Sequence, residues 1–258
     1  MRCDYLSPMS ELHTRYGITV IFYDQIGCGR STHLPEKRGD TTFWDPEMFV
    51  KELENLVEKL SIKQYYLYGQ SWGGMLGSLI ASRRPEKLRK LIISNSPADM
   101  HDWLKSCNEW RSQLPKEVND TLLKHEKAGT IEDTEYEQAC TVFFERHFCR
   151  ALPWPSVITE TFEWLKEDPT VYYTMNGPTE FHVIGPLKDW STVEESKRIE
   201  VDTLVINSRY DEGKEYVSLP FFKNIPRVKW VIMAESSHLP MWEEPERYNE
   251  VIGEFLKA

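Results

Sequence analysis

The sequence lacks any apolar run that approaches the ~20 residues of a membrane-spanning helix, so a membrane span is not expected. Its first ten residues, MRCDYLSPMS, lack the basic start and apolar stretch of a signal peptide. We find no internal repeat and no low-complexity tract in the 258 residues. These absences predict a cytoplasmic protein that forms one domain, or one domain carrying an insertion.

Two further shortages limit the partners and cofactors that we expect. The net charge is −10, and binding to phosphate backbones needs a basic face, so a nucleic-acid partner is not expected. The five cysteines are odd in number and share no metal-ligand spacing, which indicates reduced thiols rather than disulfides. The sequence therefore predicts no metal and no other cofactor, and it leaves the oligomeric state open.

The chain does contain short apolar runs that alternate with helical patterns. Five runs rich in β-branched and aromatic residues predict buried strands: Ile18–Tyr23, Tyr65–Tyr68, Leu91–Ile93, Thr203–Ile206 and Val228–Met233. Helical spacing separates them, as in residues 46–60 and 72–84. Strands that alternate with helices predict an α/β fold with a mostly parallel sheet covered on both faces.

Residues 98–199 have a different character. They hold no convincing strand, are dense in aromatic and charged residues, and show helical spacing around 103–114, 117–128 and 134–148. We therefore expect a helical cap at 98–199, inserted into a core formed by residues 1–97 and 200–258. Such an insertion would lie over the strand ends, where open α/β sheets bind ligands.

One short motif indicates nucleophilic catalysis. Gly69-Gln-Ser71-Trp-Gly73 fits the pattern G-x-S-x-G, directly follows a predicted strand and opens a predicted helix. In such a turn the serine is held out from the sheet, the two glycines leave room, and the backbone N–H of Trp72 can point at an oxyanion. The alternative is a glycine-rich helix start with an ordinary serine.

A serine hydroxyl needs an adjacent base. His238 lies just past the last predicted strand, and Asp211 lies just past the strand before it. Both should reach the same sheet edge as Ser71, and the order Ser, Asp, His is the one that α/β-hydrolases use. The alternative for His238 is a satisfied loop histidine. The remaining histidines are interpreted as surface or cap residues: His13, His33, His101, His125, His147 and His182.

Longer motifs point to a family. They are YDQIGCGRS at 23–31, GQSWGG at 69–74, FFERHFCR at 143–150, MNGPTEF at 175–181 and NSRYDE at 207–212. With these motifs the chain resembles, from residue 4 to its C-terminus, the proline iminopeptidases and the related tricorn-interacting aminopeptidases and amino-acid amidases. The resemblance implies an α/β-hydrolase fold. It also implies a serine peptidase that removes an N-terminal residue, often proline, or hydrolyses amino-acid amides through an acyl-enzyme intermediate.

The resemblance also implies how a substrate would be recognised. Glu180, in the MNGPTEF motif, and Glu212, beside Asp211, match the family carboxylates that bind the free amine of the substrate. An ammonium entering a low-dielectric pocket needs a paired charge. The alternative for Glu180 is a solvated cap carboxylate. Aromatic cap residues would line the side-chain pocket, with Phe143, Phe144 and Trp154 as candidates.

One part of the family pattern has no counterpart here. Family members carry a His-Gly-Gly-Pro-Gly stretch, which supplies a second oxyanion N–H, upstream of the segment that matches 4–6, whereas this sequence begins Met1-Arg2-Cys3. We therefore expect the N-terminal strands of the fold to be missing. Two other functions stay open: an esterase or amidase acting on a small biosynthetic metabolite, and a catalytically impaired α/β-hydrolase scaffold.

Overall fold

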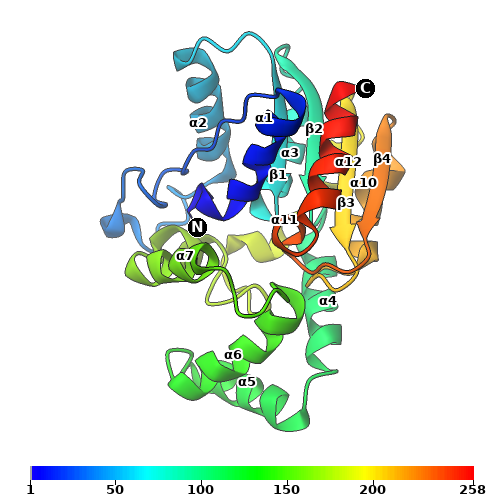
Figure 1. The fold of residues 1–258 in the computed structure, drawn as a ribbon. Helices are drawn as coiled ribbons and strands as arrows, with labels where there is room; N and C mark the ends of the chain where they lie inside the picture. Colours follow the sequence, from blue (N-terminus) through cyan, green and yellow to red (C-terminus); the bar gives the residue numbers. More distant parts are fainter. Residues whose placement is uncertain (1) are drawn as a thin grey trace.

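The computed structural model describes residues 2–258, which are built around one parallel sheet (Figure 1). The sheet has the strand order β1-β2-β3-β4, and every neighbouring pair is parallel. The strands are β1 (Tyr65–Gln70), β2 (Leu88–Ser94), β3 (Asp202–Ser208) and β4 (Val228–Met233). Four of the five predicted strands are therefore confirmed.

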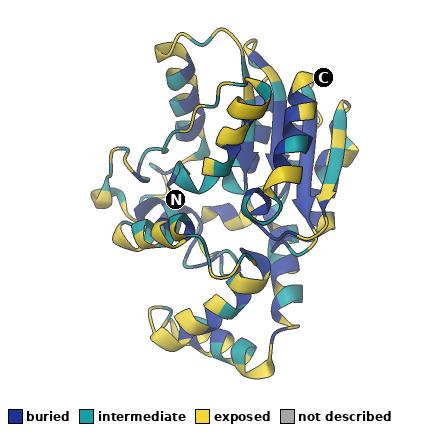
Figure 2. Cartoon of the chain, in the orientation of Figure 1, coloured by how far each residue is buried: buried dark blue, intermediate teal, exposed yellow. Residues whose placement is uncertain are grey.

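Helices cover both faces of the sheet because strand side chains alternate between the faces. In β2, Ile92 packs toward one face, while Leu91 and Ile93 pack toward the other. The first face is covered by α1 (Glu11–Tyr16) and α12 (Pro245–Lys257), and the second by α3 (Trp72–Ser82) and α10 (Glu215–Asn224). Figure 2 shows the buried strands between these partly exposed helices.

Helix α2 (Pro46–Lys59) shows why the predicted helices form where they do. Asp45 caps its N-terminus by accepting a hydrogen bond from the Glu47 N–H at 2.6 Å, and Pro46 occupies the first helical position, where its missing N–H is harmless. The buried stripe of this helix consists of Phe49, Val50, Leu53 and Val57. This stripe packs in one core cluster with α3, and α3 ends shortly before Pro85, as expected.

The segment between β2 and β3 is helical. It contains α4 (Met100–Arg111), α5 (Lys116–Ala128), α6 (Thr134–His147), α7 (Ser156–Glu167), α8 (Thr170–Met175), the 3₁₀ helix η3 (Pro186–Asp189) and α9 (Val193–Ser196). The three helices predicted within residues 103–148 are confirmed. Of the helices in residues 2–258, none is long and apolar enough to cross a membrane.

This helical segment leaves the core and returns to it at one place. Asp99 and Ser191 form an antiparallel bridge, and the Thr192 N–H donates to the Ala98 carbonyl at 2.8 Å. Helices α5 and α6 lie farthest from the sheet (Figure 1). The bridge between residues 99 and 191 therefore forms a neck at the base of the segment.

The N-terminal part corrects one expectation. The run Ile18–Tyr23, predicted as a strand, lies between α1 and the 3₁₀ helix η2 (Pro35–Lys37) and is not a strand. A strand needs a neighbour to complete its ladder of hydrogen bonds. Ile18 and Val20 pack partly against the core, whereas Ile21 and Phe22 are 50% and 37% exposed. Strand propensity without a pairing partner is not sufficient here.

Strand β1 is consequently an edge strand. Among residues 2–258 it has a neighbouring strand, β2, on one side only, and its Tyr66 side chain is 45% exposed. An open edge presents unpaired N–H and C=O groups and invites association with other chains.

The 3₁₀ helix η1 (Cys3–Ser10) packs against α7, and α11 (Pro240–Glu243) precedes α12.

Extending the chain upstream by three strands and a His-Gly-Gly-Pro-Gly loop is expected to raise its thermal midpoint and soluble yield, because an added strand would pair with the open edge of β1. Thermal denaturation and expression yield are compared between the two forms. An extension of the same composition, scrambled to break the two-residue alternation, is the control. Equal behaviour of the short and extended forms would contradict the prediction.

Candidate functional site

Ser71 occupies a strained turn between β1 and α3. Its backbone has φ 54° and ψ −123°, a region that non-glycine residues rarely adopt. A Cβ at Gly69 would lie 2.0 Å from the Gly73 carbonyl oxygen, and one at Gly74 would lie 2.6 Å from the Ser96 Cβ, whereas the space around Gly73 is open. The turn therefore requires glycine at Gly69, as expected. The second glycine that it requires is Gly74, and not Gly73 as the motif predicts.

The ends of the parallel strands bring the predicted residues to one edge of the sheet. Ser71 follows β1, Asp211 follows β3 and His238 follows β4. The His238 Nδ1 and Asp211 Oδ1 atoms are 2.7 Å apart, and both side chains are buried. A carboxylate can only accept, so Nδ1 of His238 carries the proton and Nε2 is left as the acceptor.

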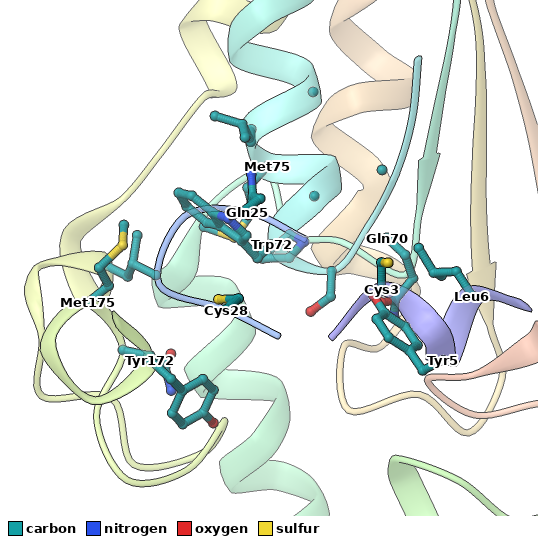
Figure 3. A pocket seen from close by; sticks show the side chains of 18 of the residues that line it. Cys3, Tyr5, Leu6, Gln25, Cys28, Gln70, Trp72, Met75, Tyr172 and Met175 are labelled. Carbon is teal, nitrogen blue, oxygen red and sulfur yellow. Dashed lines mark hydrogen bonds between the residues drawn. The ribbon is translucent and has the colours of Figure 1, made fainter. Parts of the chain in front are cut away.

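Ser71 and His238 line the same cavity, which has a volume of about 260 Å³. Across residues 2–258 the structure records no hydrogen bond between the Ser71 hydroxyl and the His238 ring, and such bonds are often long without substrate. Trp72 and Met75 flank one side of the cavity, and Tyr172 and Met175 extend toward it from α8 (Figure 3). Within the described chain no lysine or arginine lines it.

His147 braces the loops that carry Asp211 and His238. Its carbonyl accepts from the His238 N–H at 3.1 Å, and its Nδ1 donates to the Tyr210 carbonyl at 2.9 Å. Burial lowers the pKa of His147 to about 4, so the ring is neutral at neutral pH. The sequence predicts a surface or cap residue at His147; the surface alternative is wrong, because the side chain is buried at the end of α6, within residues 98–199. Helical spacing in the sequence predicts the helix that carries His147, but it does not predict the hydrogen bonds of His147 to Tyr210 and His238.

Glu180 stands in a tight turn at the cavity. Gly177 has φ 129°, and a Cβ there would lie 2.9 Å from the His182 carbonyl oxygen, so this position of the motif requires glycine. The Trp103 indole donates to the Glu180 carbonyl, and the Tyr172 hydroxyl donates to Glu180 Oε1, each at 2.9 Å. Burial raises the pKa of Glu180, and the positive charge that His238 carries when it is protonated, followed by the Tyr172 hydrogen bond, opposes that shift.

Glu212 is fully buried, and neither oxygen of its carboxyl group has a hydrogen-bond partner. Its Oε2 lies 3.8 Å from His238 Nδ1. Burial, followed by the negative charges of Glu180 and Asp211, raises the pKa of Glu212 well above its ordinary value. An unsatisfied buried carboxyl is unfavourable, and a cationic group would relieve it. Of the two carboxyl groups, Glu180 lines the cavity, whereas Glu212 does not and lies beside His238.

The expected aromatic lining is wrong. Phe143, Phe144 and Trp154 do not line the cavity. Phe143 is fully buried and packs against Phe181, with ring centroids 4.7 Å apart. Phe148, which follows α6, lines the cavity instead. All four rings belong to one aromatic-rich stretch, and sequence spacing does not indicate which ring faces the site.

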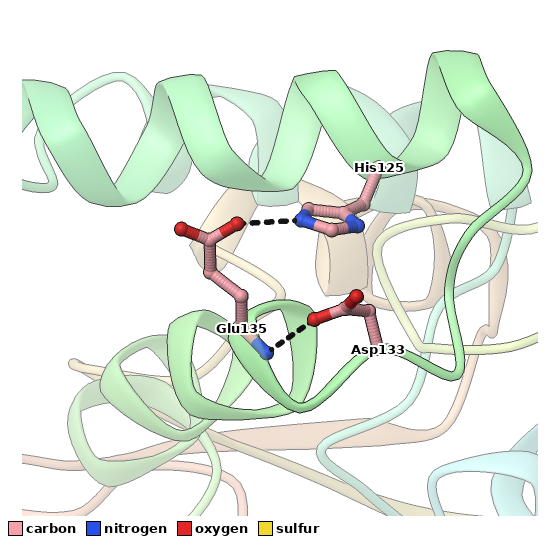
Figure 4. A group of neighbouring side chains, drawn as sticks. All are labelled: His125, Asp133 and Glu135. Atoms are coloured by element: carbon pink, nitrogen blue, oxygen red, sulfur yellow. Dashed lines mark hydrogen bonds and ion pairs between the residues drawn. The ribbon is translucent and has the colours of Figure 1, made fainter.

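Among residues 2–258, two groups of side chains have the geometry to hold a metal ion, and in both the histidine nitrogen nearest the carboxylates already has a partner. One is Asp211, Glu212 and His238, where Nδ1 is bound to Asp211. The other is His125, Asp133 and Glu135 (Figure 4). There His125 Nε2 pairs with Glu135 Oε2 at 3.0 Å, and Lys124 Nζ lies 2.6 Å from the same oxygen. The second group joins α5 to α6 as an ion-paired clasp.

The comparisons with known proteins agree with this architecture. The alpha/beta hydrolase fold family matches residues 6–245, which defines the chain as an α/β-hydrolase. The proline iminopeptidase of Saccharolobus solfataricus is 36% identical over 254 residues, which cover 98% of this chain and 80% of the relative. The chain belongs to the proline iminopeptidase family of hydrolases, as its motifs predicted.

Two solved structures are similar over nearly the whole chain. The crystal structure of VinJ has a TM-score of 0.96 and 48% identity, and the match covers 99% of this chain and 86% of that one. The proline iminopeptidase of Mycobacterium smegmatis has a TM-score of 0.92 and 42% identity, with coverage of 99% and 85%. The α/β-hydrolase fold expected from the sequence is confirmed.

Replacing Glu212 with Gln is expected to stabilise the protein more at high pH than at low pH. Because the folded-state pKa lies above the ordinary value of 4.5, folding favours the protonated carboxyl. That contribution is complete below the unfolded-state pKa and is lost as pH rises toward the folded-state pKa. Each unit of upward shift corresponds to about 1.4 kcal/mol.

Thermal denaturation from about pH 5 to about pH 8 measures the difference between Glu212→Gln and the parent protein. Glutamine does not titrate, so the difference should widen with pH. Glu163→Gln, on the exposed side of α7, is the control and should show no such trend. A difference that stays constant across this range would be inconsistent with a raised Glu212 pKa.

Proposed function

We propose that this chain is a serine hydrolase that removes an N-terminal residue, often proline, from short peptides, or hydrolyses amino-acid amides. One observation carries the proposal: Ser71, His238 and Glu180 line one cavity, His238 pairs with Asp211, and the Glu212 carboxyl group, which has no hydrogen-bond partner, lies 3.8 Å from the His238 ring. A free α-amino group is an ammonium that would pair with such carboxyl groups. The ester- or metabolite-directed alternative would favour a charge-neutral cavity, whereas Glu180 lines this one.

In the proposed mechanism Ser71 Oγ attacks the scissile carbonyl carbon while His238 Nε2 takes the hydroxyl proton. The Trp72 N–H, in the first turn of α3, stabilises the oxyanion. His238 then returns the proton to the leaving amine as the C–N bond breaks, which leaves an ester on Ser71. Water, deprotonated by His238, attacks this ester and releases the amino acid, and Ser71 recovers its proton.

Substrate recognition would rest on Glu180 and Glu212. Burial raises the pKa of both carboxyl groups, and the negative charge of Glu180 raises that of Glu212 further. One substrate ammonium placed between the two groups would therefore favour their ionised forms. The attraction would be strong because the site is poorly hydrated. Peptides with a blocked N-terminus would lack this interaction.

We further propose that residues 98–199 act as the cap of this site, over a core of residues 1–97 and 200–258. The bridge between Asp99 and Ser191 supports this division, since chain enters and leaves the segment there. The segment contributes Phe148, Tyr172 and Glu180 to the cavity. Substrate choice would therefore depend on the cap together with Glu212 of the core, and bond cleavage on the core alone.

A release assay with prolyl, alanyl and leucyl arylamides beside acyl esters tests the proposed function. Faster release from the arylamides is the expected result. Preference for the esters would favour the esterase alternative. A parent protein that neither hydrolyses these substrates nor reacts with a fluorophosphonate would be an impaired scaffold.

Substitution of the proposed nucleophile or base should abolish activity. Ser71→Ala and His238→Ala are each expected to lower kcat by several orders of magnitude, and the double variant should be little worse, because these residues act as a unit. Steady-state assays and fluorophosphonate labelling measure this. Ser82→Ala, on the same helix but outside the cavity lining, should keep parent activity. Substantial activity in purified Ser71→Ala would rule the assignment out.

Removal of one proposed amine ligand should discriminate between substrates. Glu180→Gln is expected to lower kcat/KM for free-amine arylamides by roughly 150- to 4,000-fold, since losing one partner of a buried charge pair typically costs ~3–5 kcal/mol. N-acetylated substrates should change little, and Glu163→Gln should affect neither class. If the parent protein hydrolyses blocked and free substrates equally well, the aminopeptidase function is excluded.

A further inference from the structure

Asn95 is a buried residue at the same sheet edge for which the motifs assign no role. It directly follows β2, and its backbone N–H donates to the Ile206 carbonyl at 2.8 Å, which ties it to β3. It is fully buried and has φ 47°. Asparagine tolerates this left-handed conformation better than most residues. A polar residue in such a position needs partners for its amide group.

Those partners are the loops that carry the acid and the base. Asn95 Nδ2 lies 3.0 Å from Asp211 Oδ2 and 3.2 Å from the Ser237 carbonyl oxygen, next to His238. Carboxylate and carbonyl oxygens only accept, so they fix which end of the amide faces them. The same nitrogen lies 2.9 Å from the Ser208 hydroxyl at the end of β3.

A chain of buried hydroxyls holds the other end of the amide. Asn95 Oδ1 accepts from the Ser94 hydroxyl at 2.9 Å, and Ser94 accepts from the Tyr248 hydroxyl at 2.7 Å. Tyr248 in α12 pairs with Tyr68 of β1 at 2.8 Å. These bonds run from the helix layer and the sheet to the amide. Asn95 is therefore held in one orientation, with its donor directed at Asp211.

We propose that Asn95 is a positioning residue for the Asp211–His238 pair. The terminal torsion of an aspartate is broad and roughly two-fold, so one hydrogen bond to His238 does not by itself define the carboxylate plane. The bond from Asn95 to Oδ2 holds Oδ1 toward His238 Nδ1. The bond to the Ser237 carbonyl places the His238 loop relative to the same amide. The role rests on the proposed serine-hydrolase function.

Neutrality is part of this role. An arginine or lysine at this position would also bind Oδ2, but its charge would compensate the Asp211 charge that stabilises the imidazolium of His238 during the reaction. An amide supplies a donor without a net charge. Geometry is thus fixed while the electrostatic attraction between Asp211 and His238 is retained.

The test uses two variants of the full chain. Asn95→Gly keeps the backbone freedom needed at φ 47° and removes the amide, and Asn95→Asp keeps the shape but replaces the donor with an acceptor. Misplacement of a catalytic group by 1 Å can lower the rate ~100-fold, so we expect kcat to fall roughly 10- to 100-fold in Asn95→Gly. Asn95→Asp should fall further, because two carboxyl groups then face each other. KM should stay within about twofold, since ground-state binding is not altered.

Asn249→Ala is the matched control, because Asn249 is also a buried amide but donates to the Pro245 carbonyl at 2.9 Å in α12. It should lose thermal stability and keep kcat. If Asn95→Asp does not fold, Asn95→Gly still decides. A fall in activity in Asn95→Gly that is confined to KM, or a kcat unchanged within about twofold, would overturn the inference.

A substrate-free measurement separates this inference from the proposed function. The His238 Nδ1 proton, bound to Asp211 at 2.7 Å, should give the lowest-field proton NMR resonance of the protein. It should shift or disappear in both Asn95 variants and stay unchanged in Asn249→Ala. An inactive parent protein would refute the proposed function alone. An unshifted resonance in Asn95→Gly would refute the role of Asn95 alone.

Discussion

The parallel pairing of four strands is the constraint on which the rest of the structure depends. Its hydrogen bonds continue past the strand ends: the Ser71 N–H donates to the Ser94 carbonyl, and the Asn95 N–H to that of Ile206. The Arg209 N–H likewise donates to the Met233 carbonyl. Loops that begin from strands locked in this way have little freedom. Ser71, Asn95, Asp211 and His238, which come from distant parts of the chain, therefore meet at one edge.

The site also has an energetic disadvantage that follows from its chemistry. Glu212 is buried without a hydrogen bond, and Ser71 has a strained backbone conformation. Unsatisfied carboxyl groups and strained residues are found where function maintains them, because the surrounding core stabilises the fold sufficiently. Here that support comes from three buried apolar clusters around the sheet and within the helical segment. Stability of the core thus permits an unfavourable site.

Much of this arrangement could be predicted because the chemistry follows the strands in sequence. Ser71, Asp211 and His238 each lie just beyond an apolar run, and a run of buried β-branched residues is a strong local signal. Ile18–Tyr23 has the same local signal and is not a strand, since pairing is a non-local property. Asn95 escaped prediction for a related reason: its bonds to Asp211 and to the Ser237 carbonyl join residues more than a hundred positions apart.

The surroundings of the Glu180 and Glu212 carboxyl groups, which shift their pKa values, could likewise not be predicted from the sequence. Motif resemblance indicated Glu180 and Glu212, but not that Tyr172 contacts the first or that the second lacks any hydrogen bond. Those differences arise from packing of the helical segment against the core. The same packing decided that Phe148, and not Phe143, lines the cavity.

The neck formed by Asp99 and Ser191 has a consequence for how such proteins diversify. A segment that leaves and re-enters a core at one point can change in length at little entropic cost, since the entropy of closing a loop grows only slowly with loop length. The residues between the two sides of the neck could be exchanged for those of a relative without moving Ser71, Asp211 or His238. Recombination at this neck would then transfer Phe148, Tyr172 and Glu180, which the segment contributes to the cavity, in a single step and leave Glu212 and the core residues of the cavity in place.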